Sequence, residues 1–588
     1  MQTIPQVLDR TAGEHATRAA LRVKRGGAWQ TTTWSEYRDQ VRRAARGLMA
    51  LGLTPGNGVA IMGYNRPEWF VADMAAIAAG GLPAGIYTTN TTEQCRYIAE
   101  HAEASVIVVE NRESLAKFQQ VRERLPHLKA IVMMEPADAA GQGVLGWPQL
   151  LERGAAVSEG ELDARIAAQK PDDVCTLIYT SGTTGEPKAV MLTHRNASFV
   201  GGALCELLRL GPEDRMLSYL PLSHIAEQVV SLHGPLACGA CTWFAEGLDK
   251  LGDNLREVRP TVFFGVPRVW EKMQAAMQAA GAQAPPLRRG IVAWAKKVGL
   301  AGGYAEQQGR RRPATYALAQ KLVFSKVRER LGLDAARYCV VSAAPIAVET
   351  LEYFLSLGIP ILEVYGMSEV TGPGTMSLPW AYRTGRAGRA VTGTELCVAE
   401  DGEVLMRGPH VFKGYHKNPG GTAETLDAEG WVHSGDIGEL DADGYVRVTD
   451  RKKELIITAG GKNIAPQFLE GKLRQIPAVS QAVAIGDRKP FVVALLTLDP
   501  TRVEAAARAA GSPARSVAEA TACAQFRAYL DAQVETTNRE LARYESIRKY
   551  AILPQELSVD AGELTPTLKL KRRVIHQKHA DAIEALYR

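Results

Sequence analysis

A short stretch rich in hydroxyl groups and glycine has residue types that suit phosphate binding. Residues 179–196 read YTSGTTGEPKAVMLTHRN, with small or hydroxylated residues at 181–185 followed by a lone lysine, Lys188. Glycines let backbone N–H groups approach a ligand without a Cβ in the way, and successive N–H groups beside a cation bind anions. The stretch therefore predicts a phosphate loop, although an ordinary flexible Ser/Thr/Gly hairpin has the same composition.

The spacing in this loop excludes two common phosphate motifs. Nucleotide hydrolases need G-x-x-x-x-G-K-[ST] and dinucleotide folds need G-x-G-x-x-G, and Gly182, Gly185 and Lys188 match neither pattern. Apolar, β-tending runs at 174–179 and 189–192 flank the loop. We therefore predict that it connects a strand to a second strand or to a helix.

A second group of reactive side chains follows another apolar run. Residues 359–364 lead into Tyr365, Gly366, Met367, Ser368 and Glu369. Ligands of open α/β sheets bind just past the carboxyl ends of the strands. Glu369 could hold a magnesium ion there and Tyr365 could stack on a base, although a single glutamate after a strand is more often a surface carboxylate.

The elements that must position these residues alternate along the first two-thirds of the chain. Stretches with a helical period alternate with short apolar runs at 59–62, 104–109, 130–134, 174–179, 261–265, 338–342 and 359–364. This alternation predicts an α/β fold with mostly parallel sheets. Residues 273–335 are instead rich in Ala, Gln, Arg and Lys, which indicates a helical insertion.

The pattern changes again near residue 441, to short charged turns and strands. Asp443-Gly444 is a hairpin signal, and residues 450–453 concentrate charge in a segment that suits a domain boundary. The remainder predicts a small α/β unit that ends in a basic tail, LTPTLKLKRR at 564–573. This tail is too short and too interleaved with Leu and Thr for us to prefer a nucleic-acid patch.

Composition excludes several classes of protein. The 588 residues are 46% hydrophobic and 23% charged, as in ordinary globular proteins, and a net charge of +5 implies no nucleic-acid partner. The N-terminus lacks the pattern of a signal peptide, and we expect no membrane anchor there. The longest charge-free runs, 74–92 and 228–245, contain Gly and Pro and predict a buried helix with a strand rather than membrane spans.

The cysteines and the helical insertion bear on location. Eight cysteines show one C-x-x-C, Cys238 and Cys241, without a second pair, so buried free thiols and a reducing cytoplasm are the simplest reading. Trp294, beside two lysines at 296–297 and before three arginines at 310–312, could touch the inner face of a membrane. A solvated helical hairpin with a packed tryptophan is the simpler alternative.

Six segments in order carry a family resemblance. They are YTSGTTGEPKAVMLTHRN, SAAP at 342–345, YGMSEVTG at 365–372, GEVLMRGPHVFKGYHKNP at 402–419, GWVHSGDIGELDADGYVRVTDRKKELI at 430–456 and LTPTLKLKRR. From near residue 30 to its end the chain resembles the adenylate-forming acyl-activating enzymes. The resemblance implies a large N-terminal AMP-binding part of several subdomains at 1–450, with the insertion at about 273–335. A small mobile α/β C-terminal domain at 451–588 would be hinged at Lys453.

The same resemblance implies a two-step reaction. A carboxylate and ATP give acyl-AMP and pyrophosphate, and CoA then displaces AMP to form a thioester. Thr184 and Glu369 would bind Mg²⁺, and His224, Val266 and Gly366 would border the acyl group. The implied ATP-binding residues are Thr180, Ser181, Gly182, Thr183, Thr184, Gly185, Lys188, Ala344, Pro345, Tyr365, Gly366, Ser368, Asp436 and Arg451.

The implied catalytic residues are Lys569, Glu369, Thr184 and Gly460. Lys569 would bridge the substrate carboxylate and the α-phosphate during adenylation, with Lys571 as the alternative if the register differs by two. Gly460 would border the path of the pantetheine arm, where the absence of a side chain leaves room.

The acyl substrate is predicted from the branch of the family. VPRVW at 266–270, GKNIAPQ at 461–467, the tail and the insertion resemble long-chain fatty acyl-CoA synthetases. Ala189 stands where glycine is usual, and Glu227-Gln228 lacks an arginine that many such members carry. A medium-chain or aromatic acid ligase, an acyl-AMP ligase that loads a carrier protein, and an inactive lipid- or nucleotide-binding protein are the alternatives. The expected partners are a fatty acid, ATP and CoA, with a homodimer left open.

Overall fold

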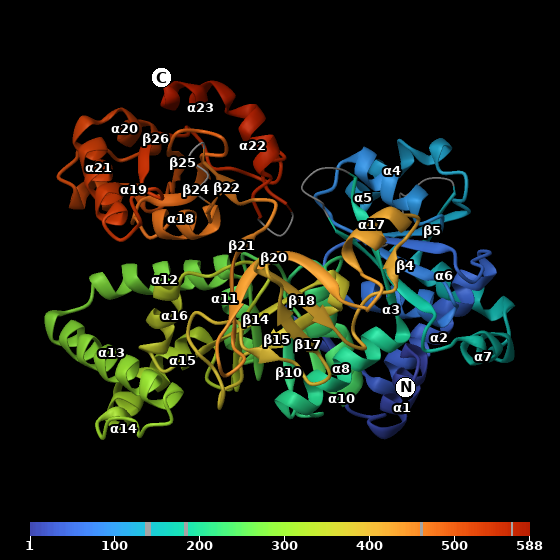
Figure 1. Cartoon of the computed structure of the whole chain (residues 1–588). Helices are drawn as coiled ribbons and strands as arrows, with labels where there is room; N and C mark the ends of the chain where they lie inside the picture. The colour runs from blue at the N-terminus through green and yellow to red at the C-terminus, as the bar shows by residue number, and fades with distance from the viewer. Residues whose placement is uncertain (136–142, 181–185, 459–462, 566–568) are drawn as a thin grey trace.

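The computed structural model describes residues 1–135, 143–180, 186–458, 463–565 and 569–588. Two large sheets, each with a parallel centre, form the body of the chain, and a smaller α/β unit at the C-terminus lies beside α12 (Figure 1). The predicted α/β fold class is confirmed, and all seven predicted apolar runs contain strands.

The first sheet has eight strands in the order β19-β9-β8-β4-β3-β5-β6-β7; the strands from β8 to β7 pair parallel, and β9 pairs antiparallel with both β8 and β19. Its central strands are buried on both faces, which explains their unbroken apolar sequences. The strands are β3 (Gly58–Met62), β4 (Leu82–Ile86), β5 (Ala104–Val109), β6 (Ala130–Met133), β7 (Val144–Gly146), β8 (Val174–Thr180), β9 (Lys188–Thr193) and β19 (Gly414–Tyr415).

The second sheet has nine strands in the order β16-β15-β14-β13-β12-β10-β11-β1-β2, and its parallel centre runs from β14 to β1. The strands are β1 (Ala19–Arg25), β2 (Ala28–Thr33), β10 (Arg215–Ser218), β11 (Cys241–Phe244), β12 (Val262–Gly265), β13 (Tyr338–Val341), β14 (Ile361–Met367), β15 (Gly372–Met376) and β16 (Arg389–Ala390).

Helices cover these sheets. They are α1 (Ile4–Glu14), α2 (Trp34–Ala50), α3 (Pro67–Ala78), α4 (Thr92–His101), α5 (Arg112–Gln119), α6 (Trp147–Arg153), α7 (Glu159–Ala168), α8 (His194–Leu208), α9 (Ile225–Gln228), α10 (Gly234–Cys238), α11 (Leu251–Val258), α16 (Val348–Leu355) and α17 (Pro419–Thr425). The charge-free run at 74–92 is the end of α3 followed by β4, and within the described residues no helix is long and apolar enough to cross a membrane.

The region predicted as an insertion is helical and projects from the body (Figure 1). Its helices are α12 (Pro267–Ala282), α13 (Pro286–Gln307), α14 (Tyr316–Ala319), the π-helical segment η4 (Gln320–Phe324) and α15 (Ser325–Leu331). The first helix begins before residue 273, because Pro267 suits the first helical position and Val266 precedes it in an extended conformation.

An antiparallel four-stranded sheet leads to the C-terminal unit. Its strands are β17 (Glu395–Val398), β18 (Glu403–Arg407), β20 (Val432–Leu440) and β21 (Val446–Arg451). The predicted hairpin at Asp443-Gly444 joins β20 to β21, and Gly444 takes the left-handed conformation, with φ of 81°.

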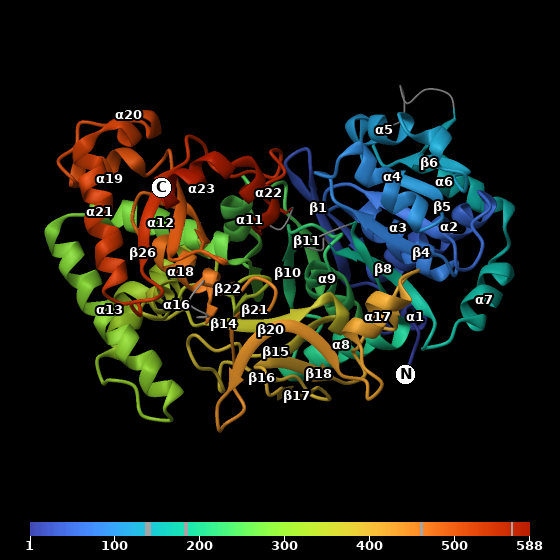
Figure 2. The same ribbon diagram turned by 45° about the horizontal axis from the view of Figure 1, so that its top comes forward.

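The C-terminal unit has its own apolar core around Phe526 and Leu530. Its elements are β22 (Ile456–Ile457), β23 (Asn463–Ile464), α18 (Pro466–Leu473), β24 (Val479–Ile485), β25 (Val492–Leu498), α19 (Val503–Ala509), α20 (Val517–Ala522), α21 (Ala524–Asn538), β26 (Ile547–Ile552), α22 (Arg572–Lys578) and α23 (Ala580–Tyr587). From another angle, Figure 2 shows this unit overlapping α12 and apart from the first sheet.

Candidate functional site

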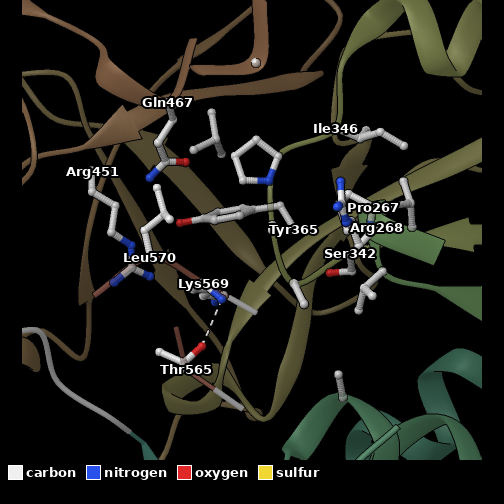
Figure 3. Close-up of a pocket in the computed structure, with 18 of the residues that line it drawn as sticks. Pro267, Arg268, Ser342, Ile346, Tyr365, Arg451, Gln467, Thr565, Lys569 and Leu570 are labelled. Carbon is white, nitrogen blue, oxygen red and sulfur yellow. Dashed lines mark hydrogen bonds between the residues drawn. The ribbon is translucent and has the colours of Figure 1, made fainter. Parts of the chain in front are cut away.

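A large cavity lies between the body and the C-terminal unit, and we call it the interdomain cleft. Its volume is about 2510 Å³, and its walls include β14, the segment after β13, the β20–β21 pair and Lys569 (Figure 3). Pockets for one small molecule are typically about 300–1,000 Å³. The interdomain cleft therefore has room for more than one substrate.

Asp436 lies on one wall as a buried acid with two defined partners. The pairing of β20 with β21 sets Arg451 directly opposite it, and Arg451 Nε lies 3.0 Å from Asp436 Oδ1. The hydroxyl of Tyr365, on β14, donates to Asp436 Oδ2 at 2.9 Å. Burial raises the pKa of Asp436, and Arg451 opposes that shift. The carboxylate is thus held in one orientation by groups from two sheets.

Lys569 reaches the same space from the C-terminal unit. Its backbone N–H donates to Thr565 Oγ1 at 3.0 Å, and its carbonyl accepts from the N–H of Thr565 (Figure 3). Desolvation by the surrounding protein lowers the pKa of the Lys569 ammonium to about 8, and the charge of Arg451 adds to this shift. The side chain is nevertheless accessible to water, because it faces the open cleft rather than packed side chains.

The two candidate lysines of the tail differ in position. Lys569 lines the interdomain cleft, whereas Lys571 is not among its lining residues. Arg572 anchors this segment: its guanidinium lies 2.6 Å from Glu470 and 3.1 Å from Glu454. The geometry therefore favours Lys569 for the role that the resemblance assigned to one of these lysines.

Glu369 is a second predicted carboxylate that lines the cleft, and only 7% of its surface is exposed. Its Oε1 accepts a 2.6 Å hydrogen bond from Tyr415, a residue that our sequence reasoning missed. The Lys188 ammonium lies 4.6 Å from the centre of the Tyr415 ring, so one tyrosine contacts both predicted phosphate-site residues. Tyr415 comes into this position through the short pairing of β19 with β9. Its sequence, GYHKNP, lies within one of the six segments that carry the family resemblance. That membership was the one sign in the sequence that Tyr415 belongs to the site.

Backbone geometry shapes the opposite wall. Ala344 and Pro345 follow β13 and are exposed toward the interdomain cleft, and Ala343 before them has a positive φ of 74°. The hydroxyl of Ser342 donates to the carbonyl of Val364 at 2.7 Å and ties this segment to β14. The hydrogen bond and the sparsely populated backbone conformation of Ala343 fix this segment beside β14.

Gly366 and Ser368 lie on the strand end that carries Tyr365. A Cβ at Gly366 would stand 1.8 Å from the carbonyl oxygen of Gly372, so the close approach of β15 requires glycine there. Ser368 is buried, and its carbonyl accepts the N–H of Thr371. Both residues line the interdomain cleft.

The predicted acyl residues lie on a more apolar side of the cleft. His224 caps α9, with Nδ1 accepting the N–H of Ala226 at 3.2 Å, and Val266 precedes α12. Burial lowers the pKa of His224 to about 4, and the charge of Lys569 adds to the shift, so this imidazole is neutral near pH 7. The apolar lining here consists of Leu204, Leu208, Ile225, Val229, Val230, Val262, Phe264 and Val340.

Of the other predicted residues, some lie in the described part of the chain and some lie outside it. Thr180 and Lys188 are paired across β8 and β9, so the phosphate loop connects two strands. Lys453 is exposed in the turn after β21, at the edge of the cleft. The predicted residues that lie outside the described part of the chain are Ser181, Gly182, Thr183, Thr184, Gly185 and Gly460.

The charges of the interdomain cleft suit a nucleotide and a second anion. Lys188, Arg451 and Lys569 supply cations, and Asp436 and Glu369 supply carboxylate acceptors. Glu369 Oε2 has no hydrogen-bond partner among the described residues and can take a hard cation. Within that part of the chain no cluster of three acidic, histidine or cysteine ligands occurs, so a metal ion here would depend on oxygens of a bound phosphate.

Comparisons with known proteins agree with this geometry. The sequence model described as "AMP-binding enzyme" matches residues 8–416, and that described as "AMP-binding enzyme C-terminal domain" matches residues 453–588. The match begins earlier than residue 30, where we expected the resemblance to begin. The crystal structure of the anthranilate CoA ligase AuaEII with anthranoyl-AMP has a TM-score of 0.76 at 21% identity, with 99% of this chain and 98% of that chain covered.

Two curated relatives extend over the full chain. Long-chain-fatty-acid–CoA ligase ACSBG2 of Xenopus laevis is 42% identical, with 100% of this chain and 84% of the relative covered. The protein of the same name from Homo sapiens is 37% identical, with 100% of this chain and 92% of the relative covered.

Proposed function

The chain belongs to the AMP-binding enzyme family, and from that premise we propose that it is an ATP-dependent long-chain fatty acid–CoA ligase. It forms acyl-AMP and pyrophosphate from the acid and ATP, and then acyl-CoA and AMP from acyl-AMP and CoA. ATP and CoA are thus co-substrates. The observation that carries this proposal is Lys569 of the C-terminal unit in one cavity with Asp436 and Tyr365 of the body and with Arg451 at the domain boundary.

Asp436 supports the binding of the nucleotide sugar. Tyr365 and Arg451 each occupy one of its oxygens and hold the carboxylate still, and the remaining lone pairs can accept hydrogen bonds from ribose hydroxyls. Ala344, Pro345 and the Tyr365 ring offer flat surfaces for the adenine. We assign the β- and γ-phosphates to Lys188 and to the loop sequence at 180–185.

Lys569 supports the chemical step. Its ammonium can contact the substrate carboxylate and the α-phosphate together, which brings two anions into reaction distance and stabilises the negative transition state. Mg²⁺ held by Glu369 and Thr184 would offset phosphate charge, and the free Glu369 Oε2 fits that use. We assign Ser368, which lines the interdomain cleft, to the α-phosphate.

The apolar side of the interdomain cleft supports a lipid acid. Its aliphatic lining can bury methylene groups, each of which contributes about 0.8 kcal/mol when removed from water. The neutral His224 can separate this region from the charged groups near Lys569. The full-length similarity to ligases named for long-chain fatty acids points the same way, and a medium-chain or aromatic acid is the second candidate.

The domain roles are part of the proposal. We place the boundary at 450/451 and the hinge at Lys453, and we assign Gly460 to the CoA path of the second step. The eight free cysteines support a reducing, cytoplasmic location.

A competition assay tests the activity. Purified protein is given ATP, Mg²⁺, CoA and equal amounts of acetate, benzoate, octanoate, palmitate and oleate, and the acyl-CoA products are measured by mass spectrometry. We expect palmitoyl- or oleoyl-CoA to dominate. Octanoyl- or benzoyl-CoA would overturn the long-chain assignment, and acyl-AMP without thioester would indicate a carrier-protein acceptor.

A variant pair tests the lysine assignment. Lys569→Ala should lower acyl-AMP formation by about 10²- to 10³-fold, because a donor aimed at the transition state is lost. It should still convert supplied acyl-AMP to acyl-CoA. Lys571→Ala is the matched control and should adenylate at nearly the normal rate, and the reverse result would move the role to Lys571.

A further inference from the structure

The helical insertion exposes apolar side chains that the fold does not use. We call residues 285–326, from the Pro-Pro turn through α13, α14 and η4 to Lys326, the basic hairpin. Leu287 is 79% exposed, more than any other large apolar side chain in the described residues, and Leu318 is 51% exposed. Ile291 and Leu322 are 40% and 42% exposed.

These four residues form two short ridges. Leu287 and Ile291 are one helical turn apart on α13, and Leu318 and Leu322 have the same spacing on α14 and η4. The core of the hairpin is made by other residues, among them Ala295, Ala319 and Phe324, which are fully buried. The ridges are therefore additional to the packing that stabilises the hairpin.

The charges around the ridges are almost all positive. Residues 285–326 contain nine of the 69 basic residues of the chain but only one of its 64 acidic residues, Glu306. That glutamate pairs with Arg312 at 2.7 Å. Among the described residues, the exposed side chains of Arg288, Arg289 and Lys321 form no ion pair. Because the whole chain carries only +5, the positive charge is concentrated on this hairpin.

We propose that the basic hairpin docks on the surface of a membrane that contains anionic lipids. Apolar ridges flanked by unpaired cations match the two layers of a bilayer interface, where apolar groups enter the acyl boundary and cations meet phosphate. The observations favour a lipid surface over nucleic acid, because a phosphodiester backbone would use the arginines but leave the leucine and isoleucine side chains in water.

The hairpin is also well placed for a lipid substrate. It forms an outer edge of the molecule in both views (Figures 1 and 2). α12 connects it to the interdomain cleft, which it lines with Lys272, Ala275, Ala276 and Ala279. A docked hairpin would hold this wall of the cleft near the lipid surface, and this use of the docking rests on the proposed function.

Vesicle sedimentation tests the docking. Full-length protein is mixed with phosphatidylcholine vesicles with and without phosphatidylglycerol, at low and high salt. We expect binding that requires phosphatidylglycerol and weakens with salt, since surface charge attraction is screened. L287S/I291S should weaken binding by about tenfold or more, because two apolar insertions are lost. Leu248→Ser, which changes an apolar residue that is 60% exposed elsewhere, is the control and should bind normally.

A charge pair completes the test. R288E/R289E should abolish binding, whereas R543E/R548E makes the same change of charge at exposed residues of the C-terminal unit and should have little effect. Lys569→Ala should bind vesicles like the parent, which separates the docking from the ligase activity. Three results would overturn the proposal. The protein binds neither kind of vesicle, the two charge variants lose binding equally, or the protein binds a DNA duplex but not vesicles.

Discussion

At the scale of single residues, the lowered pKa of Lys569 makes its charge sensitive to pH. In the proposed mechanism the ammonium form acts, and its pKa of about 8 lies below the usual 10.5, so the charge is present below pH 8 and lost above it. We expect kcat/KM for adenylation to fall about tenfold for each unit above pH 8. Lys569→Arg should be slower but lack this alkaline limb, because a guanidinium stays charged. An unchanged limb in that variant would assign the titration to another group.

Tyr415 gives a second prediction at this scale. Tyr415→Phe removes the hydroxyl that donates to Glu369 but keeps the ring below Lys188. Since a hydrogen bond to a charged group contributes about 1.5–3 kcal/mol, we expect the Mg²⁺ concentration for half-maximal activity to rise about tenfold or more. Magnesium titrations at fixed ATP measure this. Tyr64→Phe, at an exposed tyrosine, is the control, and equal behaviour of the two variants would contradict a positioning role for Tyr415.

At the scale of elements, the antiparallel pairing of β14 with β15 depends on Gly366. Gly366→Ala would set a Cβ against the carbonyl of Gly372, and backbone cannot yield as a flexible side chain can. We expect a loss of about 3 kcal/mol of unfolding free energy, seen as a lower Tm, together with loss of activity. Gly202→Ala, in the middle of α8 with open space around its position, should instead stabilise by about 0.5–1 kcal/mol. A Gly366→Ala protein with the parental Tm would show that β15 moves aside at low cost.

The strands and the fold class were predictable from the sequence, but the partners of the site residues were not. Strands buried on both faces must be apolar along their length, so runs such as 104–109 identify β5 directly. The contact of Tyr415 with Glu369 depends on a two-residue strand, β19, whose pairing with β9 has no local pattern. The nearness of His224 to Lys569 likewise joins residues far apart in sequence, and only packing of the C-terminal unit on the body reveals it.

At the scale of the whole molecule, polar contacts hold the C-terminal unit in the position that brings Lys569 into the cleft. Lys472 lies 3.0 Å from Glu349 of α16, and Arg268 Nη2 donates to Ser480 Oγ at 2.9 Å. An exposed pair contributes about 0.2–1 kcal/mol. Glu349→Lys should therefore reduce adenylation relative to thioester formation by up to about fivefold.

The reciprocal change is the test of that contact. Lys472 also lies 3.0 Å from Glu540, so the full charge reversal K472E/E349K/E540K should regain part of the lost adenylation, as expected for directly coupled groups. Separate assays of acyl-AMP formation and of acyl-AMP consumption give the ratio. Glu504→Lys, which breaks a pair inside the C-terminal unit, is the control. No recovery in the triple variant would mean that Glu349 acts independently of Lys472.

The anchoring of Arg572 determines how Lys569 can leave the interdomain cleft. Glu454 and Glu470 fix the chain three residues after Lys569, and Leu564 pairs with Leu570 around it. The backbone of Lys569 is therefore tied to the fold of the C-terminal unit. In the proposed two-step mechanism, withdrawal of Lys569 would therefore carry the C-terminal unit along and break its contacts with the body, such as that of Lys472 with Glu349.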